Sequence, residues 1–147
     1  MDIVASYLGL FSAAFLAATI LPGSSEAVLV ALLLGGLGDP LWLFVVATIG
    51  NTAGAILNWS LGRWLLRYAG RRWFPVTRGQ LARAGAWFRR YGAWSLLLSW
   101  VPIVGDPLTV AAGTLRMSFL PFVILVGIGK AARYGMVIAG TEVIRSL

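Results

Sequence analysis

The sequence predicts an all-α integral membrane protein of one domain. We expect an inverted repeat of two re-entrant helical hairpins plus two full transmembrane helices, with an amphipathic basic interfacial helix between the repeats. The 147 residues are 59% hydrophobic and only 12% charged, whereas soluble domains carry about 25% charged residues. Eight of the twelve basic residues lie between Arg63 and Arg90. A proline followed four positions later by an acid occurs at Pro22 and again at Pro102.

The first predicted hairpin covers residues 3–38. Residues 3–21 are apolar and end at Pro22 and Gly23, which together break a helix. Ser24 and Ser25 are suited to cap the next helix, and residues 26–38 are too short to cross a bilayer. We therefore expect a re-entrant hairpin, and a single kinked span is the alternative. Small residues one turn apart would let another helix approach the first arm: Gly9, Ala13 and Ala17.

Residues 41–61 are long enough for a full transmembrane helix and complete a first repeat over residues 1–62. Gly50 and Gly54 have the Gly-x-x-x-Gly spacing that favours close packing of membrane helices. Asn51 lies between them, so we expect it to face protein rather than lipid.

Residues 63–91 form the predicted interfacial segment. Thr77 and Gln80 have the spacing of a capping box, which would start a helix. This helix is expected to lie on the membrane surface with its arginines at anionic headgroups. A solvated cytoplasmic loop that only fixes the orientation of the chain is the alternative, and the two are compatible. One face of it is apolar: Leu81, Ala84, Phe88 and Tyr91. Five tryptophans are expected to anchor the chain at the membrane interfaces: Trp42, Trp59, Trp64, Trp73 and Trp87.

Residues 92–141 form the second predicted repeat, with a re-entrant hairpin over residues 92–116 and a transmembrane helix over residues 118–140. The hairpin breaks at Pro102, and Asp106 followed by Pro107 is the favoured pattern of an N-cap acid before a first-turn proline. The transmembrane helix carries two cations near its middle, Lys130 and Arg133.

The distribution of charge predicts the orientation in the membrane. Nine basic residues between Arg63 and Arg116 place that side in the cytoplasm, so both termini are expected outside, which is the periplasm in a double-membrane bacterium. The two hairpins then enter from opposite faces. The N-terminus lacks the basic region of a signal peptide, so we expect the first apolar run to be retained. Inverted repeats with broken helices that meet at the midplane are typical of transporters.

The chemistry expected at the midplane is anion binding. The half-helices that begin near Ser24 and Asp106 would direct free N–H groups and helix dipoles at one cavity, where they favour a lipid phosphate. Burial favours the neutral form of a carboxyl group, so the two acids offer a route to proton coupling. The alternative is that these charges only form structural salt bridges. The candidate substrate- and ion-binding residues are Glu26, Asp106, Lys130, Arg133, Ser24, Ser25 and Asn51.

The chain also resembles a known family over essentially its whole length. The similar segments are Phe15 to Leu34, Gly50-Asn51 with Asn58 to Arg63, and Trp100 through Gly113. They resemble the DedA family of the VTT-domain superfamily, and most closely its short YqaA-like branch. The resemblance implies movement of lipids such as undecaprenyl phosphate or phosphatidylethanolamine between leaflets, often with protons. It also implies that Glu26 is the family's acidic position in the first hairpin.

The second hairpin departs from the pattern of that family. Typical members carry an arginine three residues before the hairpin proline and another three residues after it, where this chain has Ser99 and Gly105. Lys130 and Arg133 are expected to supply the missing positive charge.

Composition narrows the classes of function. With no histidine and no cysteine, the chain cannot use a histidine base, a thiol nucleophile or His/Cys metal ligands, and we expect neither an enzyme nor a bound cofactor. The basic residues lie beside membrane segments, which indicates anionic lipid rather than nucleic acid. We therefore expect a flippase or scramblase of the bacterial inner membrane. Because the bundle is small, we expect it to form a homodimer. A proton-coupled cation exchanger that uses the same carboxylates is the alternative, and a non-transporting envelope scaffold is a third class.

Overall fold

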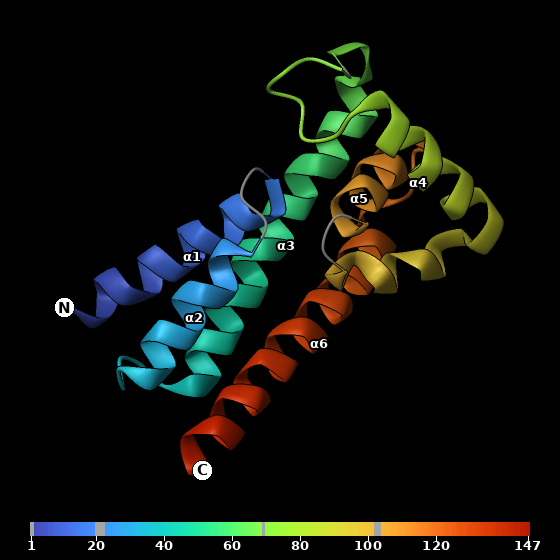
Figure 1. Ribbon diagram of the computed structural model, residues 1–147. Helices are drawn as coiled ribbons and strands as arrows, with labels where there is room; N and C mark the ends of the chain where they lie inside the picture. Colours follow the sequence, from blue (N-terminus) through green and yellow to red (C-terminus); the bar gives the residue numbers. More distant parts are fainter. Residues whose placement is uncertain (1, 20–22, 69, 102–103) are drawn as a thin grey trace.

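The computed structural model describes residues 2–19, 23–68, 70–101 and 104–147. Every regular element within these ranges is helical (Figure 1). The prolines of the two predicted breaks, Pro22 and Pro102, lie outside the described residues. The elements are α1 (Ile3–Thr19), α2 (Ser24–Leu34), α3 (Pro40–Trp64), η1 (Leu66–Tyr68), α4 (Arg78–Tyr91), η2 (Gly92–Trp100), α5 (Gly105–Thr114) and α6 (Phe119–Ser146).

Helices α3 and α6 are the two candidate membrane spans among the described residues. They contain 25 and 28 residues and are apolar enough to cross a bilayer, and both are longer than the predicted 41–61 and 118–140. Asp39 starts α3, because its Oδ1 accepts hydrogen bonds from the N–H groups of Leu41 (2.9 Å) and Trp42 (3.4 Å) ahead of the first-turn Pro40. Large hydrophobic side chains are exposed along both helices, as lipid contact requires: Leu41, Trp42, Ile49, Leu57, Ile124, Ile128, Met136 and Val143.

Helix α1 packs closely along α3 through the predicted glycines. A Cβ on Gly50 would lie 2.7 Å from the Phe11 carbonyl oxygen, and one on Gly54 would lie 2.6 Å from the Ala18 Cβ. Only glycine allows this approach. The small residues of α1 that face these glycines are Ala14 and Ala18. Of the predicted stripe, Gly9 is exposed, Ala17 is buried, and the Ala13 carbonyl accepts a hydrogen bond from Ser24 of α2.

Helices α1 and α2 form an antiparallel hairpin. The N–H of Asp39, after the end of α2, donates to the Tyr7 hydroxyl near the start of α1 at 3.2 Å. The predicted serine caps were wrong, because the N-cap of α2 is Gly23 at φ 86°, and no side chain caps this end. Glycine adopts this left-handed backbone without strain, and both Ser24 and Ser25 therefore lie inside the first turn.

Helix α4 begins at the predicted capping box. The Thr77 N–H donates to Gln80 Oε1 at 2.9 Å, and the Gln80 N–H donates to Thr77 Oγ1 at 3.1 Å. Ala84 belongs to the core cluster formed with α5 and η2, and Leu81 and Phe88 pack against it, so residues 78–91 form a packed helix, whereas residues 70–77 before it are irregular. The fourth residue of the predicted apolar face, Tyr91, is 49% exposed and stacks on Trp87.

The second hairpin consists of the 3₁₀ helix η2 and the short helix α5. The predicted N-cap of α5 was wrong: Val104 occupies that position without a side-chain cap, and Asp106 lies inside the first turn. The chain folds so tightly here that a Cβ on Gly105 would overlap the Ser99 carbonyl. The Asp106 carboxylate thus does not cap its own helix. It lies near Lys130 of α6 instead.

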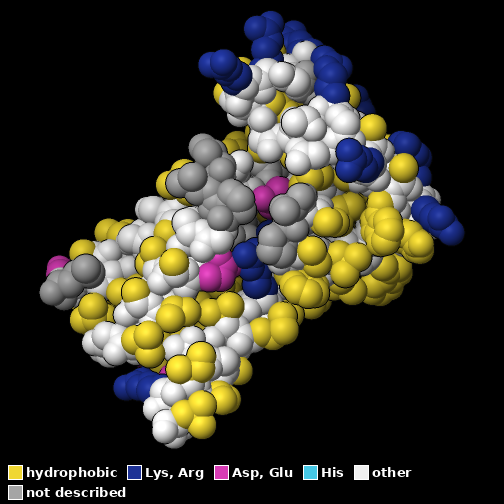
Figure 2. Space-filling view, viewed as in Figure 1, with side chains coloured by type: hydrophobic (Ala, Val, Ile, Leu, Met, Phe, Trp, Pro, Cys, Tyr) yellow, Lys and Arg dark blue, Asp and Glu magenta, His cyan; other side chains and the backbone are white. Residues whose placement is uncertain are grey.

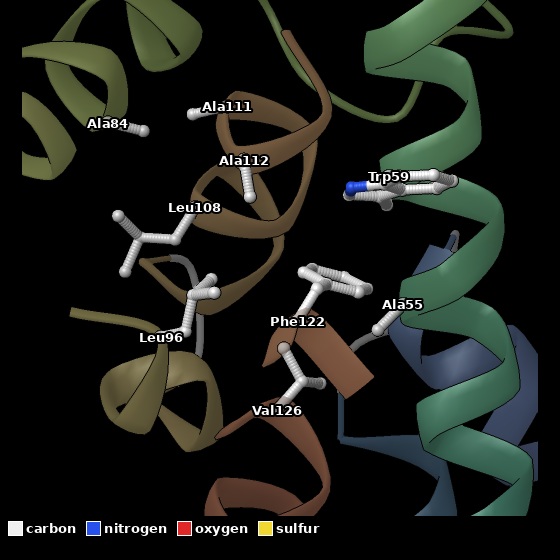
Figure 3. Close-up of a cluster of buried hydrophobic side chains, with 9 residues drawn as sticks. All are labelled: Ala55, Trp59, Ala84, Leu96, Leu108, Ala111, Ala112, Phe122 and Val126. Atoms are coloured by element: carbon white, nitrogen blue, oxygen red, sulfur yellow. The ribbon is translucent and has the colours of Figure 1, made fainter. Parts of the chain in front are cut away.

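A buried hydrophobic cluster joins α3, α4, η2, α5 and α6 (Figure 3). Trp59 contributes its ring to this cluster, is only 6% exposed, and donates its indole N–H to the Met117 carbonyl at 3.1 Å. The prediction that Trp59 is an interface anchor was therefore wrong. The other four predicted anchors are exposed: Trp42, Trp64, Trp73 and Trp87.

The two hairpins pack on the spans in a crossed pattern. The first arm of each hairpin packs on the span that follows it in the chain, α1 on α3 and η2 on α6. The second arms reach across, so that α5 packs on α3, and α2 contacts α6 more extensively than α3. As a result α6 is contacted by both hairpins, and the starts of α2 and α5 meet its middle.

Candidate functional site

The candidate site centres on the middle of α6. At 1.5 Å per residue, Lys130 and Arg133 lie roughly 17 and 21 Å along a helix of roughly 42 Å. Both cations are therefore far from either end of a candidate membrane span. Charges at such depth are stable only when they are paired or face a polar cavity.

Arg133 is paired with the first hairpin. Its guanidinium forms an ion pair with the Glu26 carboxylate in the first turn of α2. Both Glu26 carboxylate oxygens are shielded from solvent, although the two side chains are 16% and 20% exposed overall. The pair thus lies at the edge of the protein interior, with its carboxylate oxygens buried and a part of both side chains exposed.

Lys130 is held by the second hairpin. Its Nζ donates to the Ser99 carbonyl oxygen at 3.0 Å and lies 3.8 Å from Asp106 Oδ1. The lysine side chain is 1% exposed and that of Asp106 is 25% exposed. Because 3.8 Å exceeds hydrogen-bond length, the main-chain carbonyl is the firmer partner, and the Asp106 carboxylate is held more loosely than that of Glu26.

A buried hydrogen bond joins the first hairpin to the same turn of α6. The hydroxyl groups of Ser25 and Tyr134 are 2.8 Å apart, and both residues are fully buried. Tyr134 follows Arg133 directly and lies four residues after Lys130. The turn from Lys130 to Tyr134 therefore contacts the first turns of both α2 and α5.

Replacing Tyr134 by phenylalanine should destabilise the protein by about 1 kcal/mol, because the buried Ser25 hydroxyl loses its partner. The expected change is a fall of about 2–4 °C in the unfolding midpoint of the detergent-purified protein. Tyr91→Phe is the matched control, since Tyr91 is exposed and its contacts with Trp87 and Arg90 are made by the ring, which phenylalanine keeps. An unchanged midpoint for Tyr134→Phe would contradict a contribution of this bond to the position of α2.

The other predicted site residues contact α1 instead. Asn51 Nδ2 donates to the Ala14 carbonyl at 2.9 Å, and Ser24 Oγ donates to the Ala13 carbonyl at 3.4 Å. Asn58 Nδ2 makes a similar bond to the Ala18 carbonyl at 2.8 Å. Through these contacts Asn51 and Asn58 hold α1 on α3. A role of Ser24 or Asn51 in binding a substrate or ion stays a prediction.

Sequence reasoning missed two residues of this cluster. Tyr134 was detectable, because residues four apart share a helix face and Lys130 was already a candidate. The contribution of Ser99 was not detectable, because its main-chain carbonyl accepts the hydrogen bond from Lys130, and no pattern of side chains indicates such a bond.

The surface around the cluster differs from the rest of the molecule. Figure 2 shows acidic and basic side chains that meet in the middle of one face, whereas many other basic side chains gather at one end. Within the described residues there is no group of three His, Cys, Asp or Glu side chains that could hold a metal ion. The arrangement offers two cations, two carboxylates and two helix N-termini without side-chain caps, which together can bind and exchange an anion.

Comparison with known proteins identifies the relatives of this chain. The VTT domain matches residues 21–141. The inner membrane protein YqaA of Escherichia coli is 45% identical over 136 residues, which cover 92% of this chain and 91% of that protein. The undecaprenyl phosphate transporter A of Staphylococcus aureus is 28% identical over 109 residues, 68% of this chain and 54% of that protein. A Bacillus subtilis protein of the same name is 28% identical over 90 residues, 56% of this chain and 46% of that protein. No solved structure matches the chain.

Proposed function

Because the chain belongs to the VTT-domain family, which includes the DedA proteins, we propose that it moves a phosphate-bearing lipid between the leaflets of the bacterial inner membrane. Two relatives are named undecaprenyl phosphate transporters, so a polyprenyl phosphate is the first substrate to test and phosphatidylethanolamine the second. The name of the Escherichia coli relative supports the inner membrane. None of these relatives is named as an enzyme.

The proposed membrane arrangement is an inverted repeat with two re-entrant hairpins. Two observations support it. Helices α2 and α5 both start at the middle of α6. Helix α2 ends beside the start of α3, whereas the last turn of α5 packs near the end of α3. The two short helices thus leave the centre in opposite directions, as transporters with inverted repeats arrange their half-helices. In this proposal the charge distribution orients the chain with α4 at the cytoplasmic face of the membrane and both termini outside.

In this arrangement the lipid phosphate competes with the carboxylates for the two cations. Arg133 offers a planar guanidinium that can bind phosphate through two hydrogen bonds. Asp106 lies 3.8 Å from Lys130 and is the looser of the two acids, so it yields its place first. A displaced carboxylate in an apolar site favours protonation, which gives the transporter a route to proton coupling.

The position of Lys130 supports its role as a replacement for a family arginine. The resemblance to DedA proteins implies an arginine where this chain has Ser99, and the Lys130 ammonium lies 3.0 Å from the Ser99 carbonyl. In this proposal α6 supplies, beside Ser99, the positive charge that the family arginine would carry on the hairpin. Gly105, at the other arginine position, has no room for a side chain.

One observation carries the proposal: both hairpins bring a carboxylate to a cation within one turn of the same span. The test is headgroup translocation by purified protein in liposomes, measured for polyprenyl phosphate and phosphatidylethanolamine with and without a pH gradient. Translocation of a phosphate-bearing lipid above that of empty liposomes is the expected result. Cation-dependent pH changes without lipid movement would overturn the proposal in favour of a cation exchanger.

Lys130→Ala should lower the translocation rate at least about tenfold, because one charge-assisted phosphate contact is worth roughly 1.5–3 kcal/mol. Arg145→Ala is the matched control. Arg145 lies on the same helix and also pairs with an acid at 3.8 Å, but that pair is about half exposed at the end of α6. Equal rates for Lys130→Ala and the unmodified protein, with equal amounts incorporated, would remove Lys130 from the site.

A further inference from the structure

A second candidate site lies away from the charge cluster, between α4 and the last turn of α5. It is a cavity of about 300 Å³ lined mainly by apolar side chains. Helix α4 contributes Arg78, Ala82, Gly85 and Arg89, and Ala111 and Leu115 line the opposite wall.

The sequence of α4 explains the shape of this cavity. Arg78, Ala82, Gly85 and Arg89 follow the helical spacing of four, three and four residues, so they lie on one face. The two small residues leave a hollow between the arginines. Arg89 also folds back toward this hollow, since a Cβ on Gly85 would lie 3.5 Å from Arg89 Nη1.

The arginines of the cavity lack acidic partners. Within the described part of the chain, the ion pairs involve only Lys130, Arg133 and Arg145. The acid of α5, Asp106, lies in its first turn, whereas the cavity borders its last turn at Thr114 and Leu115. Both arginines are exposed, so their guanidinium groups are accessible to an external anion.

The surroundings of the cavity fit a lipid better than a soluble anion. The wall is apolar, and tryptophans with the exposure of interface residues lie on the neighbouring segments: Trp64, Trp73 and Trp87. Guanidinium groups beside an apolar hollow match the phosphate and the acyl chain of one molecule.

We propose that this cavity holds one anionic phospholipid, with its phosphate at the guanidinium groups of Arg78 and Arg89 and an acyl chain against α5. It is a binding site separate from the proposed transport site. A lipid held here would brace α4 against α5, the helix that carries Asp106.

Native mass spectrometry of the detergent-purified full chain tests this proposal with phosphatidylglycerol and, as a neutral lipid, phosphatidylcholine. The unmodified protein should retain phosphatidylglycerol preferentially. Arg78→Ala with Arg89→Ala should lower its occupancy about tenfold or more. The matched control is Arg83→Ala with Arg90→Ala, which removes the same charge from α4 outside this cavity and should retain the lipid.

A second variant tests the hollow without changing charge. Ala82→Leu places a larger apolar side chain on the exposed floor of the cavity and should displace the lipid. Equal retention of the two lipids, equal loss in both double variants, or full retention by Ala82→Leu would each overturn the proposal. This test measures retention of lipid and compares two double variants on α4, whereas the transport site is tested by translocation, so a failure of this site is distinguishable from a failure of the transport site.

Discussion

Glu26→Gln and Arg133→Ala should each abolish lipid translocation while leaving a protein that still folds. Arg133 is the guanidinium proposed to take the phosphate, and Glu26 is the carboxylate that must take Arg133 back so that the phosphate is released on the other side. Loss of a bidentate contact that is shielded from water corresponds to roughly 3 kcal/mol, or a rate about a hundredfold lower. The measurement is the initial rate of headgroup translocation in liposomes at matched protein content.

Exchange of the two charges separates transport from a purely structural role. Breaking a buried ion pair costs about 3–5 kcal/mol, and this pair should lie at the low end because its side chains are 16% and 20% exposed. The double variant Glu26→Arg with Arg133→Glu rebuilds the attraction. It should therefore restore the unfolding midpoint that the single variants lower. It should not recover transport, because the guanidinium would then project from α2.

The matched control for this exchange is Glu142→Arg with Arg145→Glu, which reverses the exposed pair at the end of α6. Surface pairs contribute about 0–1 kcal/mol, so both stability and transport should stay unchanged. Recovery of translocation by the Glu26 and Arg133 exchange would identify their pair as structural and sink the proposed role of Arg133.

Much of the helical architecture could be predicted from the sequence because it depends on local chemistry. The capping box of Thr77 and Gln80 is set by neighbouring residues, and α4 begins where this pattern occurs. The Ser24, Ser25 and Asp106 caps were wrong for the opposite reason. Their side chains have stronger uses in tertiary contacts with α1 and α6, which no local pattern reports.

The charge cluster was only partly predictable. Membrane depth alone marked Glu26, Asp106, Lys130 and Arg133 as charges that need partners. Sequence could not decide which acid meets which cation, because that depends on how the hairpins cross from one span to the other. The structure pairs Glu26 with Arg133 and Asp106 with Lys130, and adds the Ser99 carbonyl as a partner.

Gly113→Ala should destabilise the protein through the packing of α3 on α5. Helices α3 and α5 are in backbone contact through Gly113 and Gly62: a Cβ on Gly113 would overlap the Trp59 carbonyl, and one on Gly62 would overlap the Val110 carbonyl. A single methyl group must therefore push the two backbones apart. Overpacking of this kind costs about 1–3 kcal/mol, which corresponds to a fall of roughly 2–12 °C in the unfolding midpoint.

Gly127→Ala on α6 is the matched control, because nothing lies within 4 Å of the position of its Cβ. It should leave the midpoint unchanged or raise it slightly, since alanine favours a helix over glycine by about 1 kcal/mol. The contact also links packing to function: α5 carries Asp106 in its first turn, so displacement of α5 from α3 moves that carboxylate relative to Lys130. Translocation by Gly113→Ala should fall with its stability. A Gly113→Ala protein as stable as Gly127→Ala would show that α3 and α5 are not in backbone contact, and the crossed packing that brings both hairpins to α6 would then be wrong.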